Sequence, residues 1–189
     1  IFNEHVKELV SKLTRSIGIL RRASKFVNQH TRINLYNTMI LPHFDYCCTL
    51  WGTGLSKTNL SKLQKIQNCA MRIILECHHR THVKDMLQAL CWLNINQRLY
   101  YQLACLVWKI YNNQVPEYLN HLYTPQSAIH NHNTRSSAKG SIHITSSHKS
   151  SLSHNGAKLW NELPAELRNI KRFNHFKREL LQYIHSAIN

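Results

Sequence analysis

Apolar residues recur at helical spacing through most of the chain. Between Phe2 and Val27 they fall three or four positions apart, which places them on one face of a helix. This stripe consists of Val6, Leu9, Val10, Leu13, Ile17, Leu20 and Val27. Asn3 precedes the first of these positions and is a plausible N-cap. The pattern predicts one long amphipathic helix over Phe2–Val27.

Further helices are predicted along the chain. Thr31 can cap a second helix that runs through Met39 and is broken near Pro42, because proline lacks a backbone donor and clashes with the preceding turn. Later helices are expected after Ser56, Thr81, Asn94 and Pro116, and from near Asn174. We therefore expect a mostly α fold, with a helical bundle, a Ser/His-rich loop and a small C-terminal helical unit.

The composition changes between Thr124 and His154. This segment holds nine serines, five histidines and no acidic residue. With little to bury, it is predicted to be a flexible loop or linker, with a short extended piece at Ile142–Ile144. The chain is accordingly divided into N-terminal helices (1–52), a helical core region (53–123), a linker (124–154) and a C-terminal helical unit (155–189).

The charge balance is strongly basic. Lys and Arg number 24 against 9 acidic residues, a formal net charge of +15 among 189 residues. Such a charge favours a polyanionic partner, with nucleic acid as the first candidate and an acidic membrane surface as the second. A soluble basic protein without such a partner is the alternative. The apolar runs are too short to cross a bilayer, so no membrane-spanning segment is predicted, and nucleic acid, not a membrane, is the expected partner.

Five basic residues of the first helix gather on an arc beside its apolar stripe, at 100° per residue: Lys7, Arg15, Arg21, Arg22 and Lys25. No acidic residue occurs from position 9 to position 44. The arc is either a solvated face or a surface that contacts phosphates. Phosphate contact explains why no acids balance these charges, so the five residues are the candidate nucleic-acid-binding site.

Several enzyme classes lack support in the sequence. Two-metal phosphoryl transfer needs clustered carboxylates, but only two of the nine acids are aspartates and they lie forty positions apart. Five glycines form no phosphate-binding loop, and no nucleophile–base arrangement has a supporting motif. The four tryptophans can anchor a core or stack on bases, and core packing is the usual role.

Cysteines and histidines give no metal motif. The six cysteines lie in the middle of the chain among apolar residues, with no Cys-x-x-Cys, so we expect reduced and mostly buried thiols. His78 and His82 would share a helix face, but no second pair stands at a zinc-site spacing. The chain opens inside a helical pattern without an initiator methionine or a signal peptide, so we expect a piece of a longer intracellular protein, nuclear or cytoplasmic.

Several sequence blocks carry a resemblance to a known family: Leu35–Cys47 ending at Trp51-Gly52, Leu63–Asn68 with Arg72–Ile74, Trp92–Arg98, Pro116–Leu119, and Leu159–Pro164 with Ile170 and Phe176-Lys177. In this order they resemble the reverse transcriptases (RNA-directed DNA polymerases) of jockey-like non-LTR retrotransposons, a class of transposable element. They extend over nearly the whole chain. Each block is weak alone, whereas their combination and order are specific to the family.

The resemblance implies the thumb and C-terminal region of such an enzyme, with residues 1–52 as the thumb-like helices of a thumb-like bundle. Its partners would be the RNA/DNA template–primer and the palm and fingers of the full-length polypeptide. The family's paired catalytic aspartates lie upstream of this chain, so no catalytic residue is carried over, and the fragment is expected to be inactive alone. Mg²⁺ is expected only in the missing palm, with no cofactor in this chain. Cys69 departs from the family, in which a basic residue is more common there.

The alternative is a stand-alone helical protein-interaction module derived from a retroelement. A continuous basic surface would favour nucleic-acid binding, and an exposed apolar patch would favour the interaction module.

Overall fold

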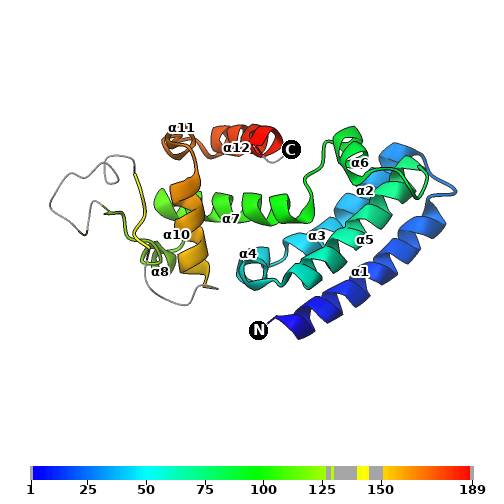
Figure 1. The fold of residues 1–189 in the computed structure, drawn as a ribbon, viewed down its shortest axis with the longest axis horizontal. Helices are drawn as coiled ribbons and strands as arrows, with labels where there is room; N and C mark the ends of the chain where they lie inside the picture. The colour runs from blue at the N-terminus through cyan, green and yellow to red at the C-terminus, as the bar shows by residue number, and fades with distance from the viewer. Residues whose placement is uncertain (1, 127–128, 130–139, 145–150, 188–189) are drawn as a thin grey trace. The chain divides into compact units, whose positions relative to one another are not determined.

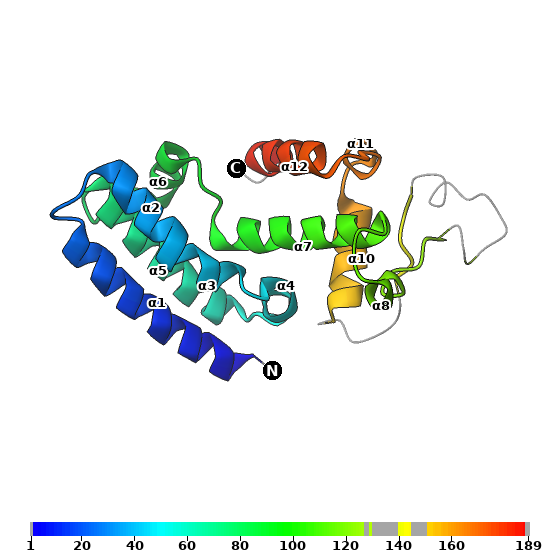
Figure 2. The same ribbon diagram turned by 180° about the vertical axis from the view of Figure 1, so that it is seen from behind.

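Two compact units make up the fold, Ile1–Arg98 and Leu99–Asn189. The structure is a computed structural model, and it describes residues 2–126, 129, 140–144 and 151–187. The described residues are mostly helical, which confirms the predicted α class (Figures 1 and 2). Their one β feature is an isolated antiparallel bridge between Pro125 and Ile142.

Unit 1 is built around two long helices. They are α1 (Asn3–Ala23) and α5 (Lys57–Leu75), which lie side by side in Figures 1 and 2. Helix α5 also packs against α2 (Gln29–Met39) and α6 (Val83–Leu90). Between α2 and α5 the chain forms α3 (Leu41–Asp45), α4 (Cys48–Trp51) and a 3-10 turn (Gly52–Gly54). The unit boundary falls inside α7 (Ile95–Tyr111).

The apolar stripe predicted for α1 and the apolar face of α5 form much of the core of unit 1. On α1 the buried residues are Val6, Leu9, Leu13, Ile17 and Leu20. On α5 they include Leu63, Ala70 and Ile74. Burying these side chains on one face leaves the opposite faces of both helices for polar and charged residues.

The first helix is shorter than predicted. Helix α1 ends at Ala23, and Lys25 and Val27 lie in the turn that follows. Phe2, not Asn3, is at the N-cap position, and it makes no side-chain cap bond. Apolar periodicity therefore overestimated the length of this helix at its C-terminal end. Just beyond Ala23, the backbone carbonyls of Ser24 and Val27 accept hydrogen bonds from the Arg32 side chain.

Besides Asn3, two further predicted N-caps are displaced, and two are confirmed. Helix α2 is capped by Asn28, whose side chain accepts the backbone N–H of Thr31, so Thr31 is not the cap. Helix α6 has His82 at its N-cap in place of Thr81. Ser56 caps α5 as predicted, through the N–H of Asn59. Asn94 precedes α7 as predicted, and it forms a capping box with Gln97.

Unit 2 is organised around three aromatic side chains. Trp108, Trp160 and Phe176 are fully buried, with ring centroids 5.7 Å apart for Trp108–Phe176 and 6.3 Å for Trp160–Phe176. They come from α7, α10 (Leu152–Glu162) and α12 (Phe173–Ala187). The short helices α8 (Glu117–Asn120) and α11 (Ala165–Arg168) complete the unit. Trp51 is also buried, so three of the tryptophans are core residues, as expected.

The predicted linker over 124–154 differs from the structure at two places. Helix α10 begins at Leu152, capped by the Ser151 side chain, because Ser151 accepts the N–H of His154. Ile142 is buried, and its backbone N–H and C=O both bond to the Asn161 side chain at 2.8 Å. The extended piece at this position is therefore fixed to α10. Residues 127–128, 130–139 and 145–150 of the predicted linker lie outside the described residues.

Candidate nucleic-acid interface

The five predicted contact residues are all solvent-exposed. Lys7, Arg15, Arg21 and Arg22 are on α1, away from its buried stripe, and Lys25 is in the turn after the helix. Arg21 and Arg22 occupy the last turn of α1, where a positive charge also interacts favourably with the helix dipole. The helix thus presents a basic surface, as expected.

Two of the five have partners that the sequence interpretation did not assign. Lys7 forms an ion pair with Glu4 at 2.6 Å, one helical turn away. The expectation that these charges lack local partners was therefore wrong for Lys7. Arg21 donates a hydrogen bond from Nη2 to the Sγ of Cys69, 3.3 Å away on α5.

Arg15, Arg22 and Lys25 form no ion pair with any residue that the structure describes. Three acidic residues of the same unit are engaged with other cations. Glu4, Asp45 and Glu76 pair with Lys7, Arg98 and Arg32 respectively. The Asp45–Arg98 contact is bidentate, at 2.6 and 2.7 Å. Burial lowers the pKa of Arg98, but the hydrogen bonds and charge of Asp45 outweigh burial and raise it.

A groove between α1 and α5 brings in a basic residue of the second helix. The groove has a volume of about 400 Å³ and is lined by Thr14, Ile17, Gly18, Arg21, Lys65, Ile66 and Cys69. Lys65 and Arg21 are thus the basic residues of this groove, and no acid lines it. In the sequence, the signal for Lys65 is the absence of acids between Asp45 and Glu76, a stretch that contains Lys57, Lys62 and Lys65.

A second groove lies on the other flank of α5. It measures about 510 Å³ and runs between α5, α6 and the start of α7. Its lining combines apolar side chains with lysines and amides: Lys57, Leu60, Ser61, Gln64, Lys65, Asn68, Val83, Leu87, Asn94 and Asn96. Lys65 therefore lines both grooves. We use "basic face" for the exposed cations Arg15, Arg21, Arg22, Lys25, Lys62 and Lys65 of α1, the following turn and α5.

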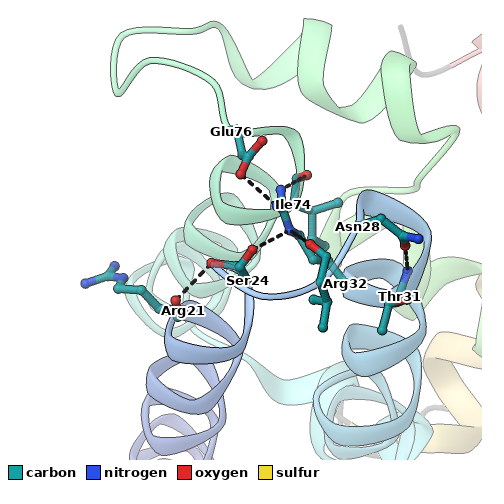
Figure 3. Close-up of polar contacts among 8 residues, drawn as sticks. Arg21, Ser24, Asn28, Thr31, Arg32, Ile74 and Glu76 are labelled. Atoms are coloured by element: carbon teal, nitrogen blue, oxygen red, sulfur yellow. Dashed lines mark hydrogen bonds and ion pairs between the residues drawn. The ribbon is translucent and has the colours of Figure 1, made fainter.

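Arg32 lies in the same acid-free stretch of the sequence, but its side chain holds the fold together and is not exposed on the basic face. Arg32 is buried, with its Nε donating to the carbonyls of Ser24 and Val27 at 3.1 Å each. Its Nη1 donates to the carbonyl of Ile74 at 3.4 Å, and its Nη2 lies 2.7 Å from the Glu76 carboxylate (Figure 3). Arg32 thus fixes the turn between α1 and α2 to the C-terminal end of α5.

The histidines and cysteines that the structure describes do not form a metal centre. His78 and His82 lie on the segment between α5 and α6, not together on a helix, and no metal-binding group of His, Cys, Asp and Glu occurs among the described residues. All six cysteines are free. The expectation of mostly buried thiols was wrong, because only Cys48 and Cys105 are buried. Cys47 and Cys91 are exposed at helix ends in the left-handed backbone conformation.

Among the described helices, none is long and apolar enough to span a membrane.

Comparisons with known proteins find no match, because the chain matches no model of a protein family, no curated protein and no solved structure.

Proposed function

We propose that this chain is the thumb and C-terminal part of a retrotransposon reverse transcriptase, and that it grips the RNA/DNA template–primer duplex. The sequence blocks described above motivate the family. The basic face is the observation that supports the binding role. The palm and fingers of the full-length polypeptide would supply the catalytic centre and its Mg²⁺, and this chain would position the nucleic acid.

The grip would act through the phosphate backbone. Lysine and arginine side chains neutralise phosphates and release condensed counterions, which gives affinity without sequence readout. The exposed cations Arg15, Arg22 and Lys25 suit this role, because they have no ion pair with a described residue to break before they meet a phosphate. Lys7 is less suited, since contact with a phosphate competes with its pairing to Glu4.

A titration against salt tests the proposal. The combined variant Arg15→Gln, Arg22→Gln and Lys25→Gln removes three charges and keeps good helix formers. Fluorescence anisotropy with a labelled RNA–DNA hybrid should show a slope of log affinity against log salt that is flatter by roughly two to three units. Binding should weaken alike for unrelated sequences, because no base is read.

A matched control removes the same charge elsewhere. Lys158, Lys171 and Arg172 are exposed in unit 2, and their combined change to Gln should leave the slope nearly unchanged. An equal effect of both triple variants would show that only net charge matters. An unchanged slope in the α1 variant would contradict phosphate contact by the cations of α1 and its following turn, and would point to Lys57, Lys62 and Lys65 instead.

The rival function, a helical protein-interaction module, is favoured by one observation. The groove between α5 and α6 is lined by the apolar residues Leu60, Val83 and Leu87. If the intact chain binds no nucleic acid at low salt, while Leu60→Asp or Leu87→Asp abolishes binding of a protein partner, the interaction module replaces the polymerase fragment.

A further inference from the structure

The turn between α1 and α2 displays an aromatic side chain almost entirely in water. Phe26 is 87% exposed, against 37–76% for the other large apolar side chains classed as exposed in the described residues. Scattered exposed apolar residues are normal, but a phenyl ring this exposed buries almost none of its surface. Folding of this chain gains nothing from the ring.

The backbone that carries Phe26 is firmly held. The residues on either side of Lys25 and Phe26, Ser24 and Val27, both accept hydrogen bonds from the buried Arg32 through their carbonyls. The N–H of Phe26 also donates to the carbonyl of Ala23 at 2.9 Å. Figure 3 shows Arg32 reaching from α2 to this turn and to the end of α5. The exposed ring is therefore presented on a braced turn.

The surroundings of Phe26 are cationic. Lys25 precedes it, and Arg21 and Arg22 occupy the last helical turn before it. A partner of this site needs a flat apolar surface for the ring and negative charge for the cations. Unstacked nucleobases on a phosphodiester chain offer both, and aromatic side chains beside cations are the usual way to bind them.

We propose that Phe26 stacks on an unpaired nucleobase, at a single-stranded overhang or frayed end, while Arg21, Arg22 and Lys25 hold its flanking phosphates. This inference rests on the proposed nucleic-acid binding and adds a preference for unpaired bases to it. A membrane surface fits less well, because interfacial segments bury a continuous apolar face. Here the neighbours of Phe26 are Lys25 and the half-buried Val27.

Two probes separate stacking from backbone binding. The first is an RNA–DNA hybrid with a single-stranded overhang that carries 2-aminopurine. The second is covalently closed circular duplex DNA, which offers no unpaired base. Phe26→Ala should weaken binding of the overhang hybrid by about 5- to 150-fold, the range for loss of one stacked base, and leave the closed duplex unaffected. The salt slope should stay the same, since Phe carries no charge.

Matched variants assign the effect to the ring. Phe26→Trp should retain both affinity and the quenching of 2-aminopurine, whereas Phe26→Leu, which is apolar without a π face, should lose both. Tyr46→Ala is the control, because Tyr46 is 72% exposed in the same unit and should not affect either probe. Circular dichroism should be unchanged throughout, because both side chains lie outside the core.

The outcomes separate this inference from the proposed function. If Phe26→Ala binds both probes like the unmodified chain, while the triple cation variant flattens the salt slope, stacking is wrong and backbone binding stands. If the unmodified chain binds neither probe, both are wrong. If Phe26→Ala instead loses binding to vesicles of phosphatidylcholine and phosphatidylserine and keeps nucleic-acid affinity, the ring meets a bilayer and stacking is overturned.

Discussion

Arg32 makes the largest set of polar contacts of any arginine in unit 1. It donates to three backbone carbonyls, and its side chain is 9% exposed. Arg32→Ala should lower the free energy of unfolding by about 2–4 kcal/mol, because it leaves buried carbonyls without a donor and opens a cavity. Urea denaturation followed by circular dichroism measures the loss.

The ion pair of Arg32 contributes less than its backbone contacts. The Glu76 side chain is 68% exposed, so solvent screens the pair. Glu76→Gln should therefore cost less than about 1 kcal/mol. Equal losses for Arg32→Ala and Glu76→Gln would show that the ion pair, and not the bonding of the carbonyls, holds the turn.

For single residues, the sequence predicts only some of the contacts that the structure shows at the site. Lys7 and Glu4 are three positions apart on a helix, so their pairing was predictable from spacing. Arg32 resembles its exposed neighbours in sequence, and its partners Ile74 and Glu76 lie 42 or more positions away. Phe26 could not be recognised either, because its exposure follows from the end of α1 at Ala23.

Helix ends give a direct test at the scale of elements. Asn28 caps α2, and its side chain accepts the N–H of Thr31 at 2.9 Å. Asn28→Ala should lower stability by about 1 kcal/mol, whereas Thr31→Ala should change it much less, because only the backbone of Thr31 takes part in the cap. The midpoint of urea unfolding for the two variants decides which residue is the cap.

Helix α7 opens with a reciprocal capping box. Asn94 accepts the N–H of Gln97, and Gln97 accepts the N–H of Asn94, both at 2.9 Å. This arrangement satisfies two backbone donors at once. The sequence identified Asn94 because the cap and its helix are adjacent in the chain. It misplaced the cap of α2, since Asn28 and Thr31 are both acceptable N-cap residues and propensity does not separate them.

Helix α10 packs closely at Gly156. A Cβ at this position would clash with the Tyr123 hydroxyl, lie 2.7 Å from its Cζ and 3.0 Å from a methyl group of Val107. Tyr123 cannot easily move, because it is buried and its hydroxyl donates to the Leu152 carbonyl at 3.0 Å. Gly156→Ala should destabilise unit 2 by about 1–3 kcal/mol, despite the better helix propensity of alanine.

Gly54→Ala is the matched control for this change. No atom lies within 4 Å of a Cβ built on Gly54. Thermal unfolding should therefore distinguish the two alanine variants. A Gly156→Ala protein as stable as the unmodified chain would contradict the close packing of α10 on Tyr123.

The whole molecule should lose stability in alkaline solution. Burial raises the pKa of Tyr36 and Tyr100 to about 12, and that of Cys48 and Cys105 to about 11, from ordinary values of 10 and 9. The unfolded chain therefore releases these protons first, and stability falls as pH rises above about 9, until the folded groups ionise near 11–12. Both units carry such groups.

Denaturation with urea over about pH 8 to pH 11, under reducing conditions, measures this effect. Tyr36→Phe removes one of the titrating groups, so its stability should fall less steeply with pH above about 10. An identical pH dependence in Tyr36→Phe would show that the phenol of Tyr36 does not ionise differently in the folded and unfolded chain.

At the scale of the whole chain, composition and periodicity predicted the helical class, because both depend on local spacing. The division at Arg98 does not follow a local signal, since it falls inside the continuous helix α7. The grooves on α5 were also not predictable, because each is lined by residues that are brought together only by packing of separate helices.

The place of Lys65 on two grooves has a consequence for their occupants. A lysine has a single ammonium group, so a ligand that holds it in one groove withdraws it from the other. Occupancy of the two grooves should then be antagonistic, and by thermodynamic linkage each ligand should weaken the other by the same factor. Acetylation of Lys65, which removes the charge, would weaken both ligands and abolish their competition.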